Sequence, residues 1–445
     1  TDFIDNSAGV DCSDNEVNIK IALNREMNEG RLAYAKRNTL LRSMTDEVSE
    51  LVLDDNRFQT LAISVAELNS KAALGSYVRR LDQFEAAGRL DRKVEGLPPN
   101  EELLRRDADG LGLTRPELAV LLSTAKLTLQ DAMEVSRVGM DPFMEDTLIA
   151  AFPAKMRKTY RKAILDHQLR SEIVATKVAN RIVNRLGIVH PFELAEEEGA
   201  TLAEGANAFL VVEHLFDLEK LFDEFDSAPM SEAARLKLLE QVGGLARSHM
   251  ADLLRSGEAD KPIATAAADL APGLAKLAKS TERLMSDVGL AAANAIASDA
   301  VALGVSAPMA NKLRHLYIMD GAIGIVSLAN RRNVDPFMVA RAFIDLNIAL
   351  GLNWAQTQAQ RLGATDPWER LLISGLARDF QQMKLDFLDR VGKGDLVAFV
   401  EKWLSSHALR VAQFRALVDG ARASPQITTA MLAQIAGQAR ALLSR

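Results

Sequence analysis

Apolar residues recur at helical spacing along most of the chain. The spacing i, i+3, i+4, i+7 places side chains on one face of a helix, and such stripes are long and regular beyond about residue 195. The clearest stripes lie in residues 210–221, 236–254, 371–387 and 399–417. After residue 25 no segment shows the polar–apolar alternation of a half-buried strand. Long amphipathic stripes joined by short loops predict an all-α chain of packed helical bundles.

Local signals predict where several helices begin. Aspartate at the N-cap followed by proline at the first helical position is a helix start, and it occurs at Asp141-Pro142, Asp335-Pro336 and Asp366-Pro367. Thr114 and Glu117 form a capping box. The sequences around the three Asp-Pro pairs show no fixed period, so we interpret them as helix starts and not as an internal duplication.

The opening stretch differs from this helical pattern. Residues 5–21 combine small and polar side chains more densely than any other part of the chain. Phe3 and Ile4 fit the end of a buried strand, and Gly9 allows a tight turn. A polar turn between a strand and a helix is where α/β folds bind ligands. The alternative is a turn whose polar side chains only cap the next helix.

These patterns predict three parts. Residues 1–30 would be a short N-terminal remnant of an α/β dinucleotide-binding domain, because a strand with a ligand-binding turn rarely stands alone at a terminus. Residues 31–195 would be a first helical region, and residues 196–445 an alanine-rich helical bundle. We therefore expect the chain to be the C-terminal part of a longer polypeptide.

Composition excludes several classes of protein. The 445 residues carry a net charge of −7, which argues against binding to nucleic acid. Cys12 is the single cysteine, so an intrachain disulfide is impossible and a reducing cytoplasm fits. The apolar runs fall short of the roughly 18 residues that a membrane span needs. We expect a cytoplasmic protein without a membrane or nucleic-acid partner.

The chain carries no sequence motif of a complete active site. No dinucleotide-binding glycine motif, zinc-protease motif or serine-hydrolase elbow is present. The segment Asp107–Gly112 lacks the acidic ligands of a calcium loop in either register. We interpret the carboxylates Asp54-Asp55 as solvated. We interpret the basic residues Arg157, Lys158, Arg161 and Lys162 as one helix face, either solvated or a docking surface. No catalytic residue and no metal site is predicted, which leaves the opening stretch as the place for any site.

Two segments resemble a known family. They are Asn6-Ser7-Ala8-Gly9-Val10-Asp11-Cys12-Ser13-Asp14-Asn15-Glu16 and Leu113-Thr114-Arg115-Pro116-Glu117-Leu118-Ala119-Val120-Leu121. Both are similar to the large-subunit bacterial NAD-dependent glutamate dehydrogenases. The resemblance implies that Asn6 lies beside the nicotinamide of NAD and that Ser13 donates a hydrogen bond to the side-chain carboxylate of the substrate. The sequence departs from the smaller dehydrogenases at Ala8 and at Asp11-Cys12.

The same resemblance implies an activity for the full-length protein. It would oxidise L-glutamate to 2-oxoglutarate and ammonia with NAD as the hydride acceptor, and it would be a homo-oligomer. The catalytic lysines, the catalytic aspartate and the glycine-rich cofactor loop of the family have no counterpart in this chain, so we expect the chain alone to be inactive. The alternative is a non-enzymatic helical module that acts in assembly or regulation.

Overall fold

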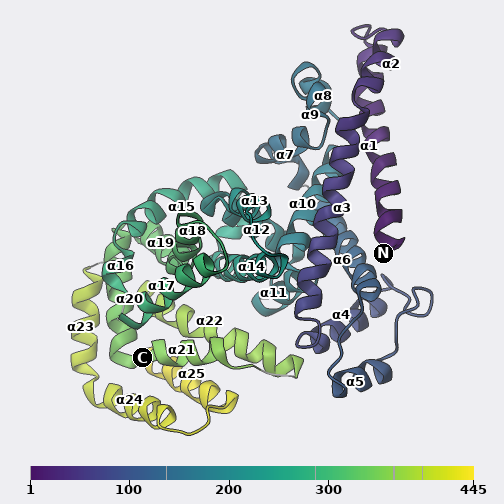
Figure 1. Cartoon of the computed structure of the whole chain (residues 1–445). Helices are drawn as coiled ribbons and strands as arrows, with labels where there is room; N and C mark the ends of the chain where they lie inside the picture. The colour runs from purple at the N-terminus through teal and green to yellow at the C-terminus, as the bar shows by residue number, and fades with distance from the viewer. Residues whose placement is uncertain (1, 137, 286, 364–365, 393, 445) are drawn as a thin grey trace. The chain divides into compact units, whose positions relative to one another are not determined.

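The computed structural model describes residues 2–136, 138–285, 287–363, 366–392 and 394–444 (Figure 1). Within these ranges the chain consists of α-helices, a few short 3-10 helices and connecting turns, with no strand. The all-α prediction is therefore confirmed. The chain divides into two compact units, Thr1–Phe192 with Thr201–Asn207 and Glu193–Ala200 with Ala208–Arg445. The finer division at residues 30 and 195 stays a prediction.

The opening stretch is a helix, so the expected strand end and turn are wrong. Helix α1 runs unbroken through Asp2–Asn28. Its small polar side chains bond back to carbonyls within the helix: Ser13 Oγ donates to the Val10 carbonyl at 2.8 Å, and Asn15 Nδ2 to that of Asp11 at 2.9 Å. Within a helix, such bonds satisfy the polar side chains that we expected to cap the next helix. No sheet remnant of a dinucleotide-binding domain is present in the residues that are described.

Four helices make the centre of the first unit. Helix α1 lies along α3 (Thr45–Leu68) and also contacts α6 (Arg115–Ser136), as Figure 1 shows. Helix α3 packs on both α6 and α10 (Arg170–Leu186), which pack on each other. Helix α6 begins as expected, because the Thr114 N–H donates to the Glu117 carboxylate at 2.7 Å. The completely buried side chains of this core include Leu23, Leu118, Leu122 and Val178.

The basic segment does not form one helix face, so that expectation is wrong. The chain breaks at Tyr160 into α8 (Ala154–Thr159) and α9 (Arg161–Leu165). Several cations bond within the unit: Lys155 pairs with Glu47 at 3.2 Å, and Arg157 Nε donates to the Phe152 carbonyl at 2.7 Å. Side chains used in this way are less available for an acidic partner.

The second unit contains the long C-terminal helices. Helix α14 (Glu232–Arg255) packs on α19 (Ala322–Arg332), and α22 (Pro367–Asp389) packs on α20 (Pro336–Leu350) and α25 (Thr429–Leu443). Two of these helices begin at the expected caps, because Asp335 accepts from the Phe337 N–H at 2.9 Å and Asp366 from the Glu369 N–H at 2.8 Å. Among the described helices, none has the length and continuous apolar character that a bilayer span requires.

Small residues let helices of the alanine-rich segment approach closely. Helix α15 (Ile263–Ala278) packs against α19. A Cβ atom placed on Gly273 would lie 2.4 Å from Val326 Cγ1, so only glycine fits there. Ala266 and Ala267 on the same helix are buried. Close helix packing therefore explains part of the alanine enrichment.

Candidate functional site

Asn6 and Ser13 lie on one exposed face of α1. At 3.6 residues per turn, two residues seven apart share a face and lie about 10 Å apart along the axis. We call Asn6, Gly9, Ser13 and Val17 the outward face, because all four are exposed. A Cβ atom on Gly9 would meet no other atom within 4 Å. The structure thus presents the two sequence-predicted residues together on the surface of the first unit.

The opposite face of α1 is partly buried: Ile4 and Asn15 are buried, and Ser7 and Asp11 are half-buried. We call Ile4, Ser7, Asp11 and Asn15 the inward face. Ser7 Oγ accepts a hydrogen bond from Gln59 Nε2 of α3 at 3.3 Å, and Asn15 Nδ2 donates to Asp11 Oδ1 at 3.1 Å. Three of these four side chains are polar, and the bond between Ser7 and Gln59 joins this face to α3.

Two carboxyls and two lysines of the first unit are electrostatically coupled. Lys177 Nζ of α10 bonds to Asp55 Oδ2 of α3 at 2.6 Å. Lys126 Nζ of α6 is buried without a hydrogen-bond partner, and so is Asp11 Oδ2. Electrostatic coupling joins Lys126 to Asp55, Lys177 and Asp11. We call these four side chains the buried polar cluster.

Burial shifts the pKa of two members of the cluster. It raises the pKa of Asp11 to about 6, with Lys177 opposing the shift and Asp55 adding to it. It lowers the pKa of Lys126 to about 7, with Asp55 opposing and Lys177 adding to the shift. In both cases a low-polarity surrounding disfavours the charged form.

The sequence pattern does not predict the buried polar cluster. The expectation that Asp54-Asp55 is solvated is wrong for Asp55, whose side chain is 20% exposed and paired with Lys177. One signal was available. Lys126 lies on the face of α6 that carries Leu122, Leu129 and Met133, where a lysine interrupts an otherwise apolar stripe.

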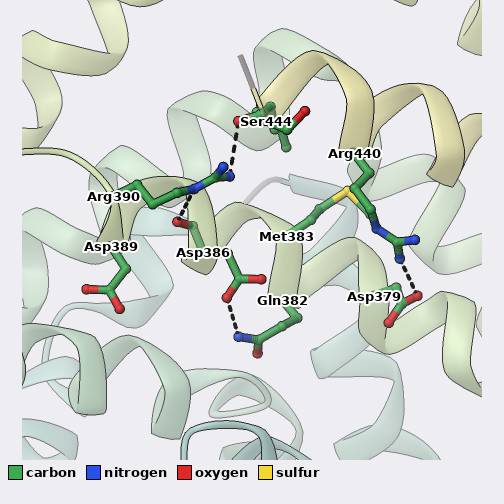
Figure 2. Close-up of a pocket in the computed structure, with 9 residues that line it drawn as sticks. Asp379, Gln382, Met383, Asp386, Asp389, Arg390, Arg440 and Ser444 are labelled. Atoms are coloured by element: carbon green, nitrogen blue, oxygen red, sulfur yellow. Dashed lines mark hydrogen bonds and ion pairs between the residues drawn. The ribbon is translucent and has the colours of Figure 1, made fainter.

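A pocket of about 670 Å3 lies in the second unit between α22 and α25 (Figure 2). Its charged side chains are bonded to neighbours. Arg440 pairs with Asp379 at 2.8 Å, and Arg390 Nη2 donates to the Leu443 carbonyl at 3.1 Å. Gln382 donates to Asp386 at 2.7 Å, as Figure 2 shows. The lining residues do not pair a nucleophile with a base, so the pocket offers no evident catalytic arrangement.

Asp379 connects this pocket to an ion-pair network. Its second oxygen, Oδ1, accepts from Arg255 of α14 at 3.1 Å. Arg255 also bonds to Glu198 at 2.5 Å, and Glu198 bonds to Arg378 at 2.8 Å. The network joins α14 and α22 to the end of α11 (His190–Glu198), which supports a structural role for these charges. Across the described residues, no group of three or more His, Cys, Asp or Glu side chains could hold a metal ion.

Most of the chain is similar to a known protein family. The family model described as "Glutamate dehydrogenase, C-terminal" matches residues 110–440. The chain belongs to this family. A second model, "Bacterial NAD-glutamate dehydrogenase, catalytic domain", matches residues 1–66. Asn6, Ser13, Asp11 and Asp55 fall in the segment matched by the catalytic-domain model, whereas Lys126 and Lys177 fall in the C-terminal family region.

Three curated relatives of the chain share the name "NAD-specific glutamate dehydrogenase". The chain is 34% identical over 428 residues to the "NAD-specific glutamate dehydrogenase" of Halomonas elongata, covering 94% of this chain and 26% of the relative. It is 33% identical to the protein of that name from Pseudomonas aeruginosa, over 97% of this chain and 27% of the relative. It is 28% identical to the protein of that name from Mycobacterium tuberculosis, over 99% of this chain and 27% of the relative. The chain thus spans about a quarter of the length of these relatives.

Proposed function

We propose that this chain is the C-terminal part of an NAD-dependent glutamate dehydrogenase. The supporting observation is that one polypeptide joins a segment similar to the catalytic domain, residues 1–66, to the C-terminal family region, residues 110–440. The full-length enzyme converts L-glutamate, NAD+ and water to 2-oxoglutarate, ammonium, NADH and a proton. Hydride leaves the α-carbon of glutamate and is accepted by the nicotinamide, while the protein orients both molecules.

Asn6 and Ser13 are the residues of this chain that we assign to that reaction. The Asn6 amide can both donate to and accept from the carboxamide of the nicotinamide, and the Ser13 hydroxyl can donate to the side-chain carboxylate of glutamate. Their shared exposed face supports the assignment, since both remain accessible to molecules bound outside the first unit. Ser13 Oγ now donates to the Val10 carbonyl, so it must exchange this bond when it binds substrate.

We further propose that the principal catalytic residues lie outside this chain. The helical units then support and assemble the enzyme, which acts in the cytoplasm as a homo-oligomer. This division of labour agrees with the paired, structural character of the charges in the second unit.

Steady-state assays test the proposal. The full-length polypeptide that carries this chain should form NADH, measured at 340 nm, when given L-glutamate and NAD. The 445-residue chain alone should form none under the same conditions. A full-length protein without glutamate-dependent NADH formation would contradict the proposal and favour a non-enzymatic helical module. Activity of the isolated chain would contradict the placement of the catalytic residues.

A further inference from the structure

We propose that the turn between α9 and α10, residues 166–169, fixes the position of α1, and that His167 is therefore a positioning residue for Asn6 and Ser13. We call residues 166–169 the clamp turn. The inference rests on the proposed function only in the roles of Asn6 and Ser13. The bonds between the clamp turn and α1 are independent of any activity.

The clamp turn bonds to α1 at two points. His167 Nε2 lies 3.0 Å from the carbonyl oxygen of Asn18. Arg25 Nη1 donates to the Asp166 carbonyl at 3.0 Å, and Arg25 Nη2 pairs with the Asp166 carboxylate at 3.2 Å. Residues 18 and 25 are seven apart, so they share one side of the helix and lie about 10 Å apart along its axis. Two points on one side fix both the rotation of α1 and its position along the axis.

The turn also decides which nitrogen of His167 donates. The Leu169 N–H donates to His167 Nδ1 at 3.0 Å. Nδ1 is therefore the acceptor, and Nε2 carries the proton that it donates to the Asn18 carbonyl. Burial lowers the pKa of His167, which favours this neutral ring, while the bond to Asn18 opposes the shift. The residue is 6% exposed, and the ring of Phe152 lies 5.7 Å from the imidazole.

The clamp turn is itself anchored to its own part of the unit. Arg170, the first residue of α10, donates from Nε to the Gly139 carbonyl at 3.0 Å and from Nη1 to the Leu165 carbonyl at 3.3 Å. A Cβ atom on Gly139 would lie 2.6 Å from Ser171 Cα, so the backbone at Gly139 packs directly on the start of α10. These contacts make the turn a fixed support for α1.

The clamp connects the two regions that the family models match. Helix α1 lies in the segment similar to the catalytic domain, and the clamp turn lies in the C-terminal family region. Asn6 and Ser13 lie about 120° around the helix from residues 18 and 25, so the clamp leaves the outward face free. Because α1 is unbroken through Asp2–Asn28, a shift at the clamp is transmitted to that face. The C-terminal region therefore positions the contacts that we assign to cofactor and substrate.

Three substitutions at His167 in the full-length polypeptide separate its two hydrogen bonds. His167→Phe keeps a ring but has no polar nitrogen. His167→Gln keeps an N–H donor near the position of Nε2. His167→Asn keeps an acceptor near the position of Nδ1, but its shorter side chain does not reach the Asn18 carbonyl.

The donor to Asn18 should decide the result. The Phe and Asn variants should take up deuterium faster in peptides of α1. They should also raise KM for both glutamate and NAD by roughly tenfold with a smaller effect on kcat, because Asn6 and Ser13 contact both molecules already in the ground state. His167→Gln should keep deuterium uptake and both KM values within about threefold of the parent.

His249→Phe is the matched control. His249 is also buried, and its Nε2 lies 3.0 Å from the carbonyl oxygen of Leu316 in α18 (Ala307–Ile318), in the second unit. Its loss removes a comparable bond far along the chain from α1. This variant should lower the melting temperature but leave deuterium uptake in α1 and both KM values as in the parent.

The outcomes separate the clamp from the activity. Unchanged deuterium uptake in α1 of the Phe and Asn variants would overturn the inference, and so would faster uptake with unchanged KM values. A Gln variant that behaves like the Asn variant would show that the bond to Asn18 does not hold α1, and this comparison decides the question even where the Phe variant does not fold. Equal KM changes in His249→Phe would reduce the effect to general destabilisation. Absence of glutamate-dependent activity in the parent would count against the proposed function alone.

Discussion

Asn6 and Ser13 carry the functional proposal, and both are ordinary helix residues in this chain. Their side chains are exposed, and the bond of Ser13 to the Val10 carbonyl is one that many helical serines make. Function at these positions therefore depends on what approaches the outward face. The small size of Ser13 and the open space at Gly9 leave that face accessible.

Replacement of Ser13 by alanine tests its role. In the full-length enzyme, Ser13→Ala should raise KM for glutamate by the equivalent of about 1–3 kcal/mol, because a substrate carboxylate loses a donor. Ser49→Ala is the matched control, since Ser49 is also exposed and bonds to the Thr45 carbonyl within a helix. Equal KM values for the two variants would remove Ser13 from the site.

Helix α19 shows how one element depends on another for its start. Its N-cap is Gly321, which has no side chain. Asp252 of α14 supplies the missing acceptor: its Oδ2 accepts from the Gly324 N–H at 2.9 Å, and its Oδ1 accepts from Gln381 at 3.1 Å. Burial raises the pKa of Asp252 to about 7, and the bond from Gly324 opposes that shift.

Two substitutions should weaken this junction. Asp252→Ala leaves the buried Gly324 N–H without an acceptor and should lower the free energy of unfolding by about 1–3 kcal/mol. Gly324→Ala brings a Cβ atom to 2.6 Å from Asp252 Oδ1 and should cost about as much through overpacking.

The control for both is Gly437→Ala on α25, where a Cβ atom meets nothing within 4 Å. It should raise stability by roughly 0.5–1 kcal/mol through helix propensity. Urea unfolding followed by circular dichroism measures all three. Equal effects at Gly324 and Gly437 would show that the contact with Asp252 does not constrain the junction.

At the scale of the whole molecule, each unit buries one lysine outside an ion pair among the residues that the structure describes. Lys126 belongs to the first unit. In the second, Lys384 is completely buried, bonds to Asn347 Oδ1 at 3.0 Å and lies 4.2 Å from the centre of the Phe343 ring. Burial lowers the pKa of Lys384 to about 7. Both units therefore link their stability to pH through a lysine.

The sign of that linkage follows from the shift. The folded pKa of Lys384 is below its ordinary value of 10.5, so between about pH 7 and 10.5 the unfolded chain binds more protons. Above about pH 10.5 Lys384 is neutral in both states and its ionisation does not affect stability. As pH falls from about 10.5 to about 7, protonation of the unfolded chain lowers the free energy of unfolding. Lys384→Met should be more stable than the parent near pH 7, and the difference should shrink by at most about 1.4 kcal/mol per pH unit towards pH 10.

Thermal unfolding of the 445-residue chain at several pH values measures this effect. Lys402→Met on α23 (Leu396–Ser406), where the side chain is exposed, is the control. A difference between Lys384→Met and its parent that does not vary with pH would show that Lys384 stays protonated in the folded chain.

Sequence alone determined the helical class and many helix starts of this protein. Periodicity and capping are local, so Thr114, Asp335 and Asp366 act as their neighbours in the sequence predict. The family was also recognisable from two short segments, and the comparisons confirmed it. The roles of Asn6 and Ser13 stay predictions.

Only the tertiary structure decided the state of the opening stretch and the partners of its polar side chains. A dense run of small polar residues is compatible with a turn, a cap or a helix, and the packing of α1 on α3 selects the helix. The buried polar cluster joins residues 11, 55, 126 and 177, which are distant along the chain. The local sequence pattern carries no information on which distant residues come together, because this depends on how the four helices pack.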